Sequence, residues 1–110
     1  MDDASLRLLR HLLTETRLLS LAVVVDGEPL AGVVPFVAAP DLGSLLVHVS
    51  RLARHTRGLD TGAAWSGALQ EPDRSDLDAL AVPRLILSGR VEEVAPGELE
   101  ALGAAWTERF

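Results

Sequence analysis

The chain has 110 residues, 48% of them hydrophobic and 24% charged, which is the balance of one globular domain. Its formal net charge of −6 means that the chain as a whole repels nucleic acid and anionic membranes, so any anion site must be local. All ten basic residues are arginine, and Lys, Cys and Tyr are absent. This composition excludes thiolate catalysis, disulfides, Cys-based metal sites, lysine Schiff bases and tyrosine acids.

The first half of the chain predicts a helix followed by a hairpin. Leucines at helical spacing predict an amphipathic helix over Asp3–Thr16. The apolar run Leu18–Val25 predicts a buried strand that is too short to span a bilayer. Asp26-Gly27 follows and favours a tight turn into a second strand over Leu30–Ala38. The acidic start of the chain lacks the charge of a secretory signal, and a cytoplasmic location is expected.

A turn at Pro40–Gly43 leads to a third strand, expected over Ser44–Ser50. Alternation along this strand predicts an apolar inner face and an outer face that carries His48, which we expect to pair with a neighbouring strand. The stretch Ser50–Gly62 then predicts a short helix closed by Gly62.

The second half predicts a fourth strand over Ala63–Leu69, a solvated acidic loop over Gln70–Ala79, and a fifth strand over Arg84–Val94. Gly89 is expected to form a bulge in the fifth strand, and Pro96 to open a last helix. Strands that follow one another mainly as hairpins indicate a mainly β protein: an antiparallel, Greek-key-like barrel with helices at its ends.

Three of the ten arginines, Arg51, Arg54 and Arg57, fall within seven residues, beside the hydroxyl groups of Ser50 and Thr56. Guanidinium groups match phosphate oxygens, and the start of a helix adds free N–H groups and a favourable dipole. The cluster therefore predicts a phosphate site. Residues at this spacing also form one solvated helix face, so the spacing alone leaves both interpretations open.

Four segments, taken in order, resemble the FMN-binding split barrels related to pyridoxamine 5'-phosphate oxidase, nearest the haem-utilisation branch. They are Pro35-Phe36, Val47–Ser50, Ser50–Leu59 and Pro83–Glu92. The resemblance runs from about Leu8 to Phe110. It implies one split-barrel domain over residues 1–110 that binds FMN at the interface of a homodimer. Relatives usually continue into a further strand after the last helix, and this chain stops at Phe110.

The resemblance also implies roles for individual residues. Ser50 and Arg51 lie where the family approaches the ribityl phosphate, and Arg54 and His55 match its basic phosphate ligands, with Thr56 as a further donor. Val33, Val34 and Pro35 match the strand whose backbone faces the isoalloxazine ring. Proline in a strand favours an edge or bulge, where a ligand can approach, although a plain edge strand explains Pro35 equally well.

The resemblance implies an FMN-dependent oxidoreductase whose chemistry belongs to the flavin, with no catalytic side chain and an unidentified small-molecule substrate. Two alternatives stay open: a module that binds or senses flavin or haem without turnover, and a barrel with an empty site. No haem ligand is carried over from the haem-utilisation branch. His48, His55 and Asp60 have no recognised metal-ligand spacing, so no metal site is predicted.

Overall fold

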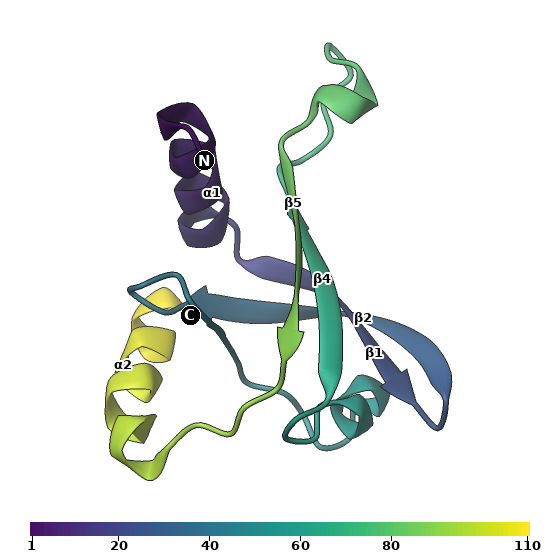
Figure 1. Ribbon diagram of the computed structural model, residues 1–110, viewed down its shortest axis with the longest axis vertical. Helices are drawn as coiled ribbons and strands as arrows, with labels where there is room; N and C mark the ends of the chain where they lie inside the picture. The colour runs from purple at the N-terminus through teal and green to yellow at the C-terminus, as the bar shows by residue number, and fades with distance from the viewer.

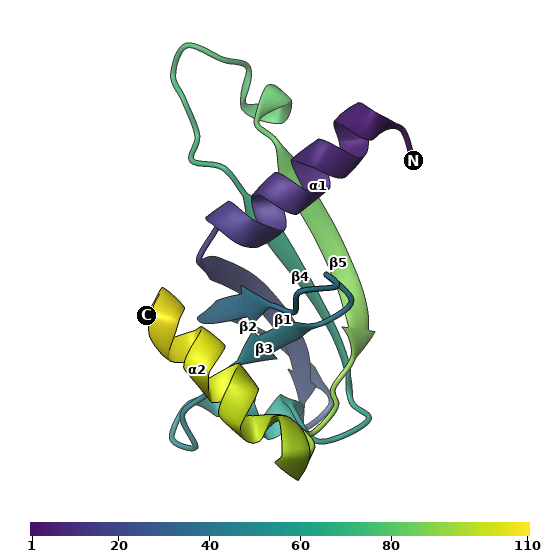
Figure 2. The same ribbon diagram turned by 90° about the vertical axis from the view of Figure 1, so that its left-hand side faces the viewer.

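A computed structural model describes residues 1–110 and shows a curled, open sheet with two helices beside it (Figures 1 and 2). The helices are α1 (Asp3–Glu15) and α2 (Leu99–Arg109). The strands are β1 (Leu18–Val25), β2 (Glu28–Ala38), β3 (Leu45–Val47), β4 (Ala64–Gln70) and β5 (Arg84–Arg90), and short 3-10 turns cover Arg54–Gly58, Ala79–Ala81 and Pro96–Glu98. No helix is long and apolar enough to cross a membrane.

All strand pairs are antiparallel, in the order β3-β2-β1-β4-β5. The first three strands follow one another as hairpins, and β4 returns to lie beside β1, which is the Greek-key connection. The mainly β, antiparallel fold predicted from the sequence is therefore confirmed as a five-stranded half-barrel whose end strands, β3 and β5, do not pair with each other.

The β1–β2 hairpin is the longest pairing and forms where the sequence predicts it. Asp26 and Gly27 have φ angles of 52° and 79°, both in the left-handed region that a tight hairpin turn with matching twist requires. Residues of β1 then alternate strictly between exposed and buried. The buried set faces the inside of the curl, so the hairpin fixes which side of the sheet becomes the core.

The core lies on the inner, concave face of the sheet. Leu19, Leu21 and Val23 of β1 pack there with Val34 and Phe36 of β2, and α1 adds a buried leucine. Both helices lie on one side of the sheet, and no element covers the outer face of β1, β4 and β5 (Figures 1 and 2). The inner face is thus the packed side of the half-barrel, and the outer face is bare.

Side chains fix the two helices at their ends. The Asp2 carboxylate accepts a hydrogen bond from the Ser5 N–H at the start of α1, and this bond lowers the pKa of Asp2. Arg109, near the end of α2, donates to the backbone carbonyls of Thr14, in the last turn of α1, and of Thr16, the C-cap of that helix. Burial of its guanidinium, together with the nearby charge of Arg17, lowers the pKa of Arg109. Arg109 therefore joins the end of α2 to the end of α1.

Two elements are shorter than expected. The third strand covers Leu45–Val47 rather than Ser44–Ser50. The helix expected over Ser50–Gly62 is wrong, because only a 3-10 turn forms, over Arg54–Gly58. Ser50 Oγ accepts the Leu52 N–H and its carbonyl accepts the Thr56 hydroxyl. These local bonds compete with a regular helix.

The expected bulge at Gly89 is also wrong, and β5 ends at Arg90 rather than Val94. Pairing of β4 with β5 is continuous, and Trp65 stands directly opposite Gly89. A Cβ atom at position 89 would lie 3.2 Å from Trp65 Nε1. Glycine is needed here because the indole ring lies across the backbone, and no extra residue is inserted.

Candidate functional site

One edge of β2 is left without a partner strand. The Phe36 N–H donates to the Arg17 carbonyl at 3.1 Å, so by register the even-numbered residues of β2 bond to β1. Ala31, Val33 and Pro35 therefore direct their backbone groups away from β1. The strand β3 pairs with β2 only at Phe36–Ala38. The N–H and C=O of Val33 thus face outward along an open edge.

The segment after β3 runs past this open edge. It leaves β2 at Val47, which is paired with Phe36, and meets β2 again where the His55 ring packs against Gly32. The eight steps of chain from Val47 to His55 can extend about 27 Å, whereas the four steps from Phe36 to Gly32 cover about 14 Å. The segment therefore has spare length, which is taken up in a turn that carries Ser50 to Arg54, and we call these five residues the bowed segment.

The three clustered arginines are all exposed, but they do not share one environment. Arg57 donates to the Asp26 carboxylate at 2.7 Å and is held against the β1–β2 turn. Neither Arg51 nor Arg54 forms an ion pair or a hydrogen bond through its guanidinium. The cluster therefore keeps two free cationic groups on the bowed segment, and the third is neutralised within the chain.

The other predicted phosphate ligands have mixed positions. Ser50 is exposed, and its hydroxyl hydrogen is not committed, because its oxygen serves as the acceptor for Leu52. The Thr56 hydroxyl already donates to the Ser50 carbonyl. His55 is half-buried on the inner side of β2, where its ring fills the space of the missing Gly32 side chain. Since no regular helix begins here, a phosphate would rely on side chains rather than on a helix dipole.

The three predicted residues of β2 differ in what they can offer. Val33 has a side chain that is 62% exposed on the outer face, and its backbone groups are free of β1. Val34 has its side chain in the core and its backbone bonded toward β1. Pro35 is half-buried and lacks an N–H, as suits the last residue before β3 pairing begins. Of these three residues, Val33 therefore has the most groups free for a ligand.

The structure places the other aromatic and imidazole groups elsewhere. His48 packs edge-on against Trp106 of α2, with ring centroids 5.8 Å apart, so the expected pairing of His48 to a neighbouring strand is wrong. Trp65 packs against the core from β4. No group of three His, Asp or Glu side chains gathers closely enough to hold a metal ion.

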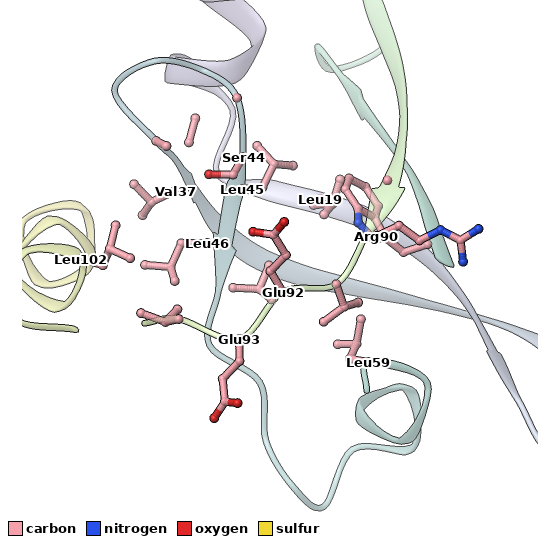
Figure 3. A pocket seen from close by; sticks show the side chains of 18 of the residues that line it. Leu19, Val37, Ser44, Leu45, Leu46, Leu59, Arg90, Glu92, Glu93 and Leu102 are labelled. Carbon is pink, nitrogen blue, oxygen red and sulfur yellow. The ribbon is translucent and has the colours of Figure 1, made fainter. Parts of the chain in front are cut away.

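A separate cleft of about 710 Å³ opens on the inner side of the half-barrel, between β3 and the chain that follows β5 (Figure 3). None of the eight residues predicted to bind the cofactor lines this cleft. Sequence reasoning missed it, because its walls come from the two end strands and α2, which are far apart in the chain. The alternating apolar residues of the third strand were its only sequence signal.

No protein-family model and no curated protein matches the sequence. Solved structures do match. The haem storage protein HutZ from Vibrio cholerae superimposes with a TM-score of 0.74 at 25% identity, over 98% of this chain and 75% of that one. A protein of unknown function from Agrobacterium tumefaciens gives a TM-score of 0.73 at 29% identity, over 96% and 45% of the two chains.

An FAD- and haem-binding protein from Mycobacterium smegmatis gives a TM-score of 0.68 at 23% identity, over 99% of this chain and 54% of that one, which shows a shared fold alone. This chain thus spans three quarters of HutZ and about half of the other two proteins. The five-stranded half-barrel and these matches show that the chain has the split-barrel fold of these proteins, as its resemblance to the group related to pyridoxamine 5'-phosphate oxidase implied.

Proposed function

We propose that this protein binds FMN along the open edge of β2 and works as a flavin-dependent oxidoreductase on a small-molecule substrate. The observation that carries the proposal is the pairing of two features on neighbouring segments. Val33 offers an unpaired backbone donor and acceptor, and the bowed segment beside it offers the free guanidinium groups of Arg51 and Arg54. Relatives described as binding FAD and haem, or storing haem, support a cofactor-binding role for this fold.

The two features suit the two ends of a flavin mononucleotide. The pyrimidine edge of the isoalloxazine ring carries hydrogen-bond donors and acceptors, which an unpaired strand edge can match as it would match another strand. The phosphate at the other end carries negative charge, which guanidinium groups bind through charge-assisted hydrogen bonds. A single phosphate is in keeping with two free arginines and one free hydroxyl, that of Ser50.

No acid or base stands at this edge. The edge residues Ala31, Val33 and Pro35 carry no titratable side chain, and His55 is packed on the inner face against Gly32. Oxidation and reduction would therefore depend on the flavin itself, with the chain binding, orienting and shielding it. A nicotinamide electron donor and turnover of a substrate are part of this proposal. A bound flavin that no nicotinamide donor reduces would favour a binding module without turnover.

We further propose that a second copy of the chain completes the site by packing on the bare outer face of the sheet. Cross-strand pairing places small or apolar side chains side by side there, in two rows across β2, β1, β4 and β5: Val33, Ser20, Ala68 and Ile86, then Ala31, Ala22, Ser66 and Ser88. Neither row holds a carboxylate, although the chain has 16 acidic residues. A face without carboxylates lets two acidic chains approach each other with little charge repulsion.

Val33 belongs both to this face and to the proposed flavin edge, so a second copy seated on the face would also cover the flavin from solvent. A test uses two exposed apolar side chains: Ile86 on the face, 71% exposed, and Leu80 in the β4–β5 loop, 80% exposed. In sedimentation equilibrium we expect the wild-type chain and Leu80→Glu to be dimers and Ile86→Glu to be a monomer. A monomeric wild-type chain, or a dimeric Ile86→Glu, would contradict the dimer face.

The cofactor proposal is tested by the visible absorption spectrum of the protein as isolated, followed by titration with FMN and riboflavin. We expect a flavin spectrum, release of FMN on denaturation, and binding of FMN at least about tenfold tighter than riboflavin, because riboflavin lacks the phosphate. A haem Soret band in place of the flavin spectrum would assign the site to haem. Colourless protein that binds neither flavin would contradict the proposal and would favour a barrel with an empty site.

A further inference from the structure

We propose that the cleft between β3 and the chain after β5 is a second binding site, which takes an apolar organic cation such as a long-chain or polycyclic amine. This site goes beyond the proposed flavin function, since none of the residues proposed to hold the flavin lines it. Three observations support it: the size and lining of the cleft, an unneutralised carboxylate that reaches into it, and an indole ring in its wall.

The cleft exists because the sheet is open. The two end strands, β3 and β5, face each other across it, and the inner face of β1 forms its floor with Leu19 and Leu21. Leu45 and Val47 of β3 and Leu102 of α2 add apolar walls. A cleft of about 710 Å³ is within the range of small-ligand sites, and burial of an apolar ligand against this lining is favourable.

The charge around the cleft is negative. Three glutamates, Glu92, Glu93 and Glu98, line it, and none of them forms an ion pair. In Figure 3 the Glu92 carboxylate points into the space between Leu45 and Leu59. Arg90 is the one basic side chain of the lining. Its guanidinium contacts the Gly62 carbonyl at 3.4 Å and points away from Glu92 (Figure 3).

An apolar cation satisfies this combination better than a neutral or anionic ligand. Its apolar body replaces water on the leucine and valine lining, and its positive group meets the Glu92 carboxylate at the mouth. The ring of Trp65, which also lines the cleft, attracts cations through its π face. An anionic amphiphile with the same apolar body would place its negative charge among three carboxylates, and their repulsion would weaken its binding.

The test compares three probes with the same alkyl chain: dodecylamine, dodecanol and dodecanoate, each below its micelle concentration or its solubility limit, measured by isothermal titration calorimetry at pH 7. We expect dodecylamine to bind about fivefold more tightly than dodecanol, and dodecanoate to bind more weakly than both. Glu92→Gln is expected to remove most of the preference for the amine. Glu100→Gln, an exposed carboxylate of α2 outside the lining, is the matched control and is expected to keep it.

Equal binding of the three probes, or a preference for the amine that survives in Glu92→Gln, would overturn the cation site. Absence of binding by every probe would overturn it as well. Circular dichroism of both variants keeps the comparison valid, because an exposed Glu→Gln change at either position leaves the core untouched. FMN affinity is expected to be the same in both variants, so failure here is distinct from failure of the flavin proposal.

Discussion

The substitution Arg54→Ala tests the proposed contact with the phosphate without changing the other groups of the site. Arg54 is exposed and makes no contact with a carboxylate, so its removal leaves the fold intact. A charge-assisted hydrogen bond to phosphate contributes about 1.5–3 kcal/mol, and the exposure of Arg54 favours the lower end of that range. We therefore expect FMN to bind about tenfold more weakly to Arg54→Ala, measured by quenching of flavin fluorescence in a titration at fixed ionic strength.

Two controls make this prediction specific. Riboflavin lacks the phosphate, so its affinity is expected to be the same for the wild-type chain and for Arg54→Ala. Arg57→Ala removes the same kind of side chain three residues away, but Arg57 is already paired with Asp26 at 2.7 Å. Its loss is expected to change FMN affinity less than about twofold and stability by at most about 1 kcal/mol. Equal weakening of FMN and riboflavin by Arg54→Ala would refute the assignment of Arg54 to the phosphate.

Three further predictions concern stability and are measured by urea unfolding. A Cβ atom at Gly58 would lie 2.7 Å from Val23 Cβ, so Gly58→Ala is expected to lower the free energy of unfolding by about 1–3 kcal/mol. A Cβ atom at Gly97 would have nothing within 4 Å, so Gly97→Ala is the control and is expected to leave stability unchanged. Equal effects of the two substitutions would contradict the close packing of the 3-10 turn on β1. Arg109→Met removes two charge-assisted hydrogen bonds to the end of α1 and is expected to lower the free energy of unfolding by about 2 kcal/mol. A decrease under about 0.5 kcal/mol would show that Arg109 does not hold α2 against α1. The hydrogen bond from the Ser5 N–H to the Asp2 carboxylate lowers the pKa of Asp2 in the folded chain. The ionised Asp2 therefore stabilises the fold above its ordinary pKa of 3.8, and this stabilisation is lost as the pH falls through the lower pKa of the folded chain. Asp2→Asn is therefore expected to lose less stability than the wild-type chain between pH 5 and pH 2.5, and an equal loss would contradict the cap.

Features fixed by neighbouring residues could be predicted from the sequence. The β1–β2 hairpin forms where expected, because Asp26-Gly27 supplies two positive φ angles between two apolar runs. The predicted inward face of the third strand is also correct: Leu45 and Val47 of β3, and Val49 beyond its end, pack against the core. In each case the structure depends on residues only a few positions apart, so the local sequence pattern was enough to predict it.

Features that depend on distant residues could not be predicted in this way. Helical spacing of Arg51, Arg54 and Arg57 suggested one cationic helix face, but the chain forms a 3-10 turn whose Gly58 packs on β1. Arg57 is removed from the cluster by Asp26, which is 31 positions away. Nothing in the spacing of the arginines distinguishes the paired member from the free ones. The composition of the phosphate cluster was therefore predictable, and its division into two free groups and one paired group was not.

Both proposed sites have one physical origin, which is the incomplete pairing of the sheet. Along β2, pairing with β3 stops before Pro35, and the backbone of Val33 is left for a hydrogen-bonding ligand. At the ends of the sheet, β3 and β5 stay apart, and the inner apolar face is left open with Glu92 at its mouth. Closing the barrel within the chain would satisfy these groups and raise stability, but it would also remove both openings. A variant in which one opening is closed is thus expected to be more stable and no longer to bind the ligand proposed for that opening. The ligand proposed for the other opening is expected to bind as before.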